Sequence, residues 1–216
     1  DEPTGEWRLD RWPDFAAAGL APRELRIYVP AGAGPWPVLY MHDGNNLFDP
    51  NAMWGGWRLQ DALETQEPVL VVGIDNTWDR MDEYTHVEDD IGYVGAYITG
   101  GAGTAYAELV TEHLRPFVEA TYGSTGHDGL LGSSLGGLIS LYIAHLYPGQ
   151  YDFAGSMSGT LGWGSFGMSN PVMLELYEAE GVRDTVLYLD SGGSEGADGV
   201  CRDMDGDGIV EDDPDS

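Results

Sequence analysis

The chain has 216 residues, of which 42% are hydrophobic and 21% are charged, enough apolar material to bury the core of one domain. Acidic residues dominate the charge: 37 Asp and Glu stand against 9 basic residues, all of them Arg, for a net charge of −28. A surface this negative repels phosphates and anionic lipids, so we expect neither nucleic acid nor a membrane surface as a partner. No apolar run approaches the roughly 20 residues that a membrane-spanning helix needs.

Apolar patterning predicts strands that alternate with helices along the chain. Residues 24–30 alternate apolar and polar side chains, which is typical of an edge or outer strand. The continuous apolar runs 38–41 and 69–74 are typical of central parallel strands that are covered on both faces. Further strands are predicted at 129–132, 153–157 and 185–189, and helices at 57–63, 106–118, 135–147 and 170–181. This order predicts an α/β fold with a mostly parallel, doubly wound sheet and helices on both faces.

The most specific motif is a G-x-S-x-G sequence between a predicted strand and a predicted helix, in Gly132-Ser133-Ser134-Leu135-Gly136-Gly137. A serine on so tight a turn adopts strained backbone geometry, and only small residues two positions away let the flanking backbones pass. Ser134 is therefore the candidate nucleophile. The N–H of Leu135, at the positive end of the following helix, is the first candidate donor to an oxyanion.

A second loop, His42-Asp43-Gly44-Asn45-Asn46, directly follows the predicted strand 38–41. In a parallel sheet this loop and the serine turn lie at the same carboxyl edge, so a backbone N–H of Gly44 or Asn45 is a candidate second oxyanion donor. The alternative is an ordinary turn, because Asp, Gly and Asn are common turn residues.

Three segments carry a family resemblance. They are residues 40–49, beginning Tyr40-Met41-His42-Asp43-Gly44; residues 72–76 with Arg80 and Glu83-Tyr84-Thr85; and residues 132–142, which contain the serine turn. Together they resemble the putative-esterase family of α/β-hydrolases, which includes esterase D, enterochelin-type siderophore esterases, feruloyl and acetyl-xylan esterases and mycolyltransferases. The resemblance covers residues 20–195. It implies an α/β-hydrolase fold and a serine esterase that uses a Ser–acid–His triad on an acyl, aryl or carbohydrate-linked ester.

The resemblance also implies where the acid and the base of the triad belong. The acid follows the last predicted strand, so Glu195 is the first choice, with Asp198 and then Asp190 behind it. The histidine belongs near the C-terminus, yet no His follows His145. We therefore expect a C-terminal fragment or a second chain to supply the base, together with a disulfide partner for Cys201.

An acidic segment near the C-terminus has the ligand order of calcium loops, with alternate carboxylates followed by a glycine that permits a sharp turn. The predicted ligands are Asp203, Asp205, Asp207, the carbonyl of Ile209, Glu211 and Asp213. The alternative is a solvated acidic tail. We assign residues 1–200 to the hydrolase domain and treat 201–216 as an insertion or tail within it. A structural Ca²⁺ is the expected cofactor, and none is expected for catalysis.

The candidate substrate-binding residues belong to the loops around the serine: Asn46, Trp54, Trp57, Trp78, His86 and Trp163. Tryptophans at these positions would suit an aryl or glycosyl ester, although core packing is their commoner role. Calcium and a disulfide are both typical of extracellular proteins, so we expect a secreted or periplasmic protein. Two other functions stay open, namely acyl transfer to an alcohol and a non-catalytic, calcium-dependent binding module on a hydrolase scaffold.

Overall fold

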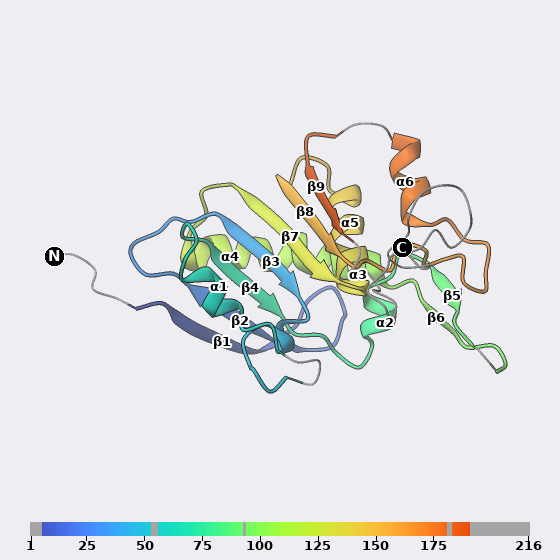
Figure 1. The fold of residues 1–216 in the computed structure, drawn as a ribbon, viewed down its shortest axis with the longest axis horizontal. Coiled ribbons are helices and arrows are strands. Elements are labelled where there is room, and N and C mark those ends of the chain that lie inside the picture. The colour runs from blue at the N-terminus through green and yellow to red at the C-terminus, as the bar shows by residue number, and fades with distance from the viewer. Residues whose placement is uncertain (1–5, 53–55, 93, 181–182, 191–216) are drawn as a thin grey trace, which may run out of the picture.

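The computed structural model describes residues 6–52, 56–92, 94–180 and 183–190, and a seven-stranded sheet forms its centre (Figure 1). The strands, in spatial order, are β1 (Arg8–Phe15), β2 (Arg23–Val29), β4 (Leu70–Ile74), β3 (Val38–His42), β7 (Asp128–Ser133), β8 (Phe153–Met157) and β9 (Val186–Asp190). The β1–β2 and β2–β4 pairs are antiparallel, and the other four pairs are parallel. The predicted, mostly parallel α/β fold is therefore confirmed.

Continuous apolar sequence explains why β3 and β4 lie at the centre of the sheet. Every residue of β4 is buried. Because side chains alternate along a strand, Val72 belongs to the larger core on one face, whereas Val71 belongs to a smaller core on the other. A strand covered on both faces has no position that favours a polar side chain.

Helices cover both faces of the sheet. The larger core includes side chains of α3 (Gly103–Glu108), α5 (Leu135–Leu146) and α6 (Met173–Glu180). The smaller core packs against α1 (Leu59–Leu63). A π-helical turn, η2 (Leu109–Leu114), joins α3 to α4 (Arg115–Tyr122), so the helix predicted at 106–118 is the middle of a longer helical segment, which lies behind the sheet in Figure 1.

Two regions differ from the sequence-based expectation. The strand predicted at 24–30 is an outer strand, as expected, but β1, which the sequence pattern did not predict, pairs with it and forms the edge of the described sheet. The polar stretch 75–103 contains α2 (Arg80–Glu83) and a separate hairpin of β5 (Glu88–Asp90) and β6 (Ile98–Gly100). These elements are short and carry no apolar periodicity, so the sequence pattern does not show them.

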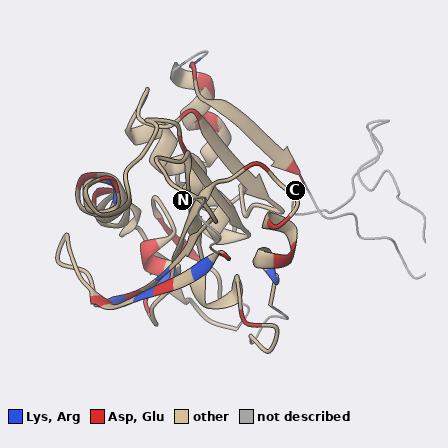
Figure 2. Cartoon of the chain, turned by 90° about the vertical axis from the view of Figure 1, so that its left-hand side faces the viewer, with Lys and Arg blue, Asp and Glu red and all other residues tan. Residues whose placement is uncertain are grey.

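Acidic side chains are distributed over helices, strands and loops of the fold (Figure 2). Two arginines of β2 form ion pairs with acidic side chains, Arg23 with Glu83 and Arg26 with Asp75, each with a nitrogen–oxygen distance of 2.8 Å. Arg23 is almost completely buried, so its partner is also needed to compensate its desolvation. Among the helices that the structure describes, none combines the length and the apolar character of a membrane span.

Candidate active site

Ser134 lies in the sharp turn between β7 and α5, with backbone angles φ 57° and ψ −126°. A positive φ is strained for serine. The turn depends on its glycines, because a Cβ placed on Gly132 would lie 2.4 Å from the carbonyl carbon of Gly136. The strained strand-to-helix turn expected from the motif is present, at the carboxyl end of the parallel strands.

The loop that follows β8 contacts Ser134 directly. The Ser134 N–H donates to the Met157 carbonyl at 3.0 Å, and the Thr160 N–H donates to the Ser134 carbonyl at 3.3 Å. The two hydroxyls, Ser134 Oγ and Thr160 Oγ1, lie 3.2 Å apart. Sequence reasoning missed Thr160, and the only available signal was that its loop follows a strand next to β7.

The loop after β3 lies beside this turn. It begins at Asp43, which has a left-handed φ of 58°, and forms a 3-10 helix, η1 (Gly44–Asn46). A Cβ on Gly136 would lie 3.3 Å from Asp43 Oδ2, so the two loops are in van der Waals contact. Gly44 is pressed against β4, because a Cβ there would lie 2.7 Å from the Gly73 carbonyl carbon. The N–H groups of Leu135 and of Gly44 and Asn45 thus belong to neighbouring helix starts, where backbone donors have no acceptor within their own helix.

Arg80 of α2 holds the loop after β3. Its Nε donates to Asp43 Oδ1 at 2.7 Å and its Nη2 donates to Asp43 Oδ2 at 2.8 Å. The Asn76 side-chain amide donates to Asp43 Oδ1 as well, at 2.5 Å. Burial alone would lower the pKa of Arg80, but the hydrogen bonds and charge of Asp43 raise it above the ordinary value. The charged guanidinium therefore holds the Asp43 side chain by two hydrogen bonds and so restrains the backbone of Asp43.

Two cavities meet at Ser134. One has a volume of about 620 Å³ and is lined by Arg80, Met81, Asp90, Ile91, Gly92, Ser134, Leu135, Thr160, Trp163 and Phe166. The other has a volume of about 540 Å³ and is lined by Asp43, Asn46, Trp57, Asn76, Arg80, Ser133 and Ser134. Their sizes are those of small-molecule sites. The larger cavity has the aromatic side chains of Trp163 and Phe166 in its wall, and Trp57 is the one aromatic residue among the described residues that line the smaller cavity.

Besides Ser134, the structure brings four of the predicted site residues to these cavities. Asn46 and Trp57 line the smaller cavity, and Leu135 and Trp163 line the larger one. Two other predicted residues lie elsewhere. Trp78 is fully exposed, and His86 is buried with its Nε2 2.7 Å from the Pro171 carbonyl, so neither lines a cavity at Ser134.

Two of the histidines that the structure describes, His42 and His86, are buried. Burial lowers the pKa of His42 to about 3, and its Nδ1 lies 3.0 Å from the Tyr106 hydroxyl, so this histidine is neutral and held inside the core. Burial also lowers the pKa of His86. Among the residues that the structure describes, no histidine lines either cavity.

Several predicted residues lie outside the described part of the chain. They are Trp54, the first two acid candidates Glu195 and Asp198, Cys201, and the calcium ligands Asp203, Asp205, Asp207, Ile209, Glu211 and Asp213. The third acid candidate, Asp190, is described at the end of β9. Its Oδ1 accepts the Ser158 N–H at 2.9 Å and its Oδ2 accepts the Tyr188 hydroxyl at 2.9 Å.

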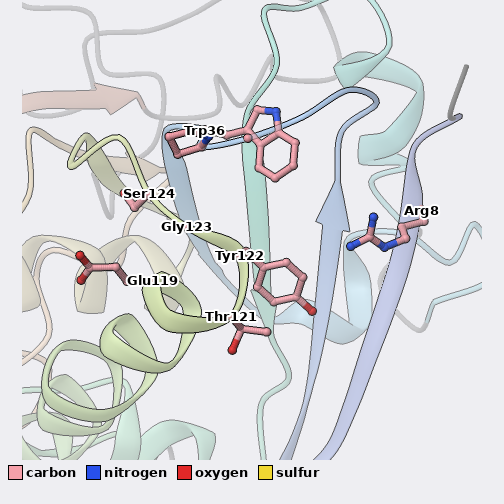
Figure 3. A pocket seen from close by; sticks show the side chains of 9 residues that line it. Arg8, Trp36, Glu119, Thr121, Tyr122, Gly123 and Ser124 are labelled. Carbon is pink, nitrogen blue, oxygen red and sulfur yellow. The ribbon is translucent and has the colours of Figure 1, made fainter. Parts of the chain in front are cut away.

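A hollow of about 630 Å³ lies at the other end of the sheet (Figure 3). Its walls include Trp36, just before β3, and Ser124, just before β7, with Tyr122 and Arg8 on the side of β1. The amino ends of parallel strands face away from the site at their carboxyl ends. This hollow is thus separate from the site at Ser134.

Two known proteins are similar to this chain in sequence. The Bacillus subtilis protein YbbA is 31% identical over 153 residues, which cover 64% of this chain and 57% of that protein. The siderophore triacetylfusarinine C esterase of Aspergillus fumigatus is 27% identical over 139 residues, covering 62% of this chain and 47% of the enzyme. The chain thus spans about half the length of these relatives.

Among solved structures, an IroE-like serine hydrolase from Shewanella oneidensis superposes with a TM-score of 0.61 at 23% identity, over 74% of this chain and 53% of the other. That likeness shows a shared α/β-hydrolase fold. The family model named Putative esterase matches residues 21–204, a span that begins before β2 and includes the serine turn, the loop after β3 and both cavities. On this match the chain belongs to the Putative esterase family.

Proposed function

We propose that this chain carries the nucleophile of a serine carboxylic-ester hydrolase, with Ser134 as the attacking residue. The observation that carries the proposal is the position of Ser134: it lies in a strained turn, between two cavities, beside the starts of two helices. An exposed hydroxyl next to converging backbone N–H donors is the arrangement that acyl transfer requires.

In the proposed reaction Ser134 Oγ attacks the ester carbonyl, and its proton passes to a histidine. The N–H of Leu135 and an N–H of Gly44 or Asn45 stabilise the oxyanion of the tetrahedral intermediate. Arg80 acts through Asp43, whose fixed backbone sets the direction of the second donor. The alcohol leaves with the proton from the histidine, and water then releases the acyl group by the same steps.

We propose that the histidine comes from a C-terminal fragment or a second chain. Glu195 orients this histidine, and a disulfide to Cys201 anchors the fragment or chain that carries it. The exposure of β9, the last strand of the described sheet, supports the proposal that a further segment covers this strand. Four of its residues are exposed and apolar, Val186, Leu187, Tyr188 and Leu189, with exposed fractions of 41% to 63%. An uncovered apolar edge strand is an unfavourable surface for a protein in water.

The substrate we propose is a small-molecule ester, because the cavities have that size and the Aspergillus relative is named as a siderophore esterase. We further propose a structural Ca²⁺ on the loop 203–213 and a secreted or periplasmic location, where Ca²⁺ is abundant and disulfides persist.

The test is hydrolysis of p-nitrophenyl acetate, together with labelling by a fluorophosphonate probe, and it uses the intact protein with the fragment or second chain that supplies the histidine. Ser134→Ala should abolish both, whereas Ser124→Ala, at the remote hollow, should leave both unchanged. Hydrolysis that survives Ser134→Ala would contradict the assignment of the nucleophile. Absence of labelling in the parent protein would favour the non-catalytic binding module, and faster product release on addition of a sugar or lipid alcohol would favour acyl transfer.

A further inference from the structure

Asp89 occupies an unusual position for an acid in so acidic a chain. It is the central residue of β5 and is completely buried. Its Oδ2 accepts the N–H of Gly164 at 2.7 Å and of Phe166 at 2.9 Å. Its Oδ1 accepts the N–H of Gly167 at 3.1 Å and of Met168 at 3.0 Å. One carboxylate thus binds four backbone donors of a single loop, which is more than a side-chain amide oxygen can accept.

The rest of the loop, which we call the wall loop (residues 160–170), is also fixed to β5. The indole N–H of Trp163 donates to the Val87 carbonyl at 2.8 Å, and the Asn170 amide donates to the Glu88 carbonyl at 2.7 Å. The backbones lie so close that a Cβ on Gly167 would be 2.3 Å from the Asp90 carbonyl oxygen. The wall loop therefore takes its shape from β5, with Asp89 at the centre of the contact.

This shape builds one side of the larger cavity at Ser134. Trp163 and Phe166 of the wall loop both line it, and their rings meet edge to face at 6.1 Å. Trp163 is buried, whereas Phe166 is 47% exposed. Ile91, directly after β5, lines the same side. A flat aromatic group that enters between these side chains and Leu135 can make further edge-to-face contacts.

We propose that Asp89 is a positioning residue which holds the wall loop so that the larger cavity takes an aromatic group of the ester substrate. The proposal rests on the proposed function, since it assumes that the substrate is an ester bound at Ser134. An aromatic ring can belong to the acid or to the alcohol of the ester, and the experiment distinguishes the two.

The experiment measures ester binding to Ser134→Ala protein, which cannot hydrolyse its ligand, by calorimetry. Methyl benzoate carries the ring in the acid, benzyl acetate carries it in the alcohol, and methyl butyrate has no ring. We expect one of the aromatic esters to bind about tenfold more tightly than methyl butyrate. Asp89→Asn, added to Ser134→Ala, should remove most of this preference, because Asn has one acceptor oxygen and directs N–H donors at the loop amides. Glu88→Gln, the matched control on the exposed neighbour, should retain it.

Two further measurements complete the test, and the first keeps its outcome clear if Asp89→Asn does not fold. Phe166→Ala leaves the anchor intact and should lower the affinity for the preferred aromatic ester about fivefold. Hydrogen exchange should show protected amides at Gly164, Gly167 and Met168 in the parent, and faster exchange there in a folded Asp89→Asn protein. Equal affinity for all three esters, or an unchanged preference in Asp89→Asn, would overturn the proposal. Because Ser134→Ala protein is used throughout, an enzyme without Ser134-dependent hydrolysis would contradict the proposed function but leave this result intact.

Discussion

Replacing Arg80 by Gln should destabilise the protein through the loop beside Ser134. The Arg80–Asp43 pair has two hydrogen bonds of 2.7 and 2.8 Å, and its side chains are 28% and 12% exposed. The guanidinium also lies 5.1 Å from the centre of the Tyr84 ring. Gln has no charge and a shorter side chain, so it cannot reproduce the paired hydrogen bonds together with the ring contact, and the partly buried Asp43 side chain would be left with Asn76 as its described side-chain donor.

The magnitude follows from this partial burial. Breaking a fully buried pair costs about 3–5 kcal/mol and breaking an exposed one costs about 0–1 kcal/mol. For the pair at Arg80 we therefore expect a loss of about 2–3 kcal/mol in the free energy of unfolding. In a protein of this length such a loss lowers the melting temperature by roughly 5–10 °C.

The assay is a double-mutant cycle in urea with Arg80→Gln, Asp43→Asn and the double variant. Asn suits Asp43 because it tolerates the left-handed φ of 58°. The coupling energy should be at least about 1 kcal/mol. The matched control is Arg58→Gln, whose partner is Asp61 and whose side chains are 64% and 49% exposed, so it should cost less than about 0.5 kcal/mol. A coupling energy near zero would refute the idea that Arg80 holds Asp43.

The remaining predictions concern the serine turn, the core histidine and the acidic loop. Gly132→Ala should cost at least about 3 kcal/mol in urea unfolding, because the added methyl would overlap the Gly136 backbone; a stable Gly132→Ala protein would contradict the described turn. His42, with a folded pKa of about 3, should make stability fall as the pH drops from about 6.5 towards 3, since the unfolded chain binds the proton first. His42→Gln should flatten this dependence in urea melts at pH 7, 5 and 4, and an unchanged slope would assign the pH effect to other groups. Chelation of Ca²⁺ should lower the melting temperature of the parent protein, and Asp205→Asn should reduce that shift; a melting temperature that chelator does not move would count against the calcium loop.

The central strands and the serine turn could be predicted because their signals are local. A continuous apolar run is enough to identify β4, and Gly132 and Gly136 identify the turn since each lies two residues from Ser134. β1 could not be predicted in the same way. It contains Pro13 and alternating charges, and its outer side has no partner strand among the described residues, so burial imposes little pattern on it.

Residues that act between distant segments could not be identified from the sequence. Glu88, Asp89 and Asp90 are three consecutive acids, and composition gives no reason to prefer one of them. Side chains alternate along β5, and the side chain of Asp89 is the one that hydrogen-bonds the wall loop, more than 70 residues later in the chain. An unpaired backbone N–H in this buried contact would be costly, so the loop needs these acceptors. Burial alone would raise the pKa of Asp89, but hydrogen bonds from the N–H groups of Phe166, Gly167, Gly164 and Asp90 hold it below its ordinary value. Asp89, one of 37 acids in the chain, is therefore part of the internal structure beside Ser134, and only the pairing of distant backbones identifies it.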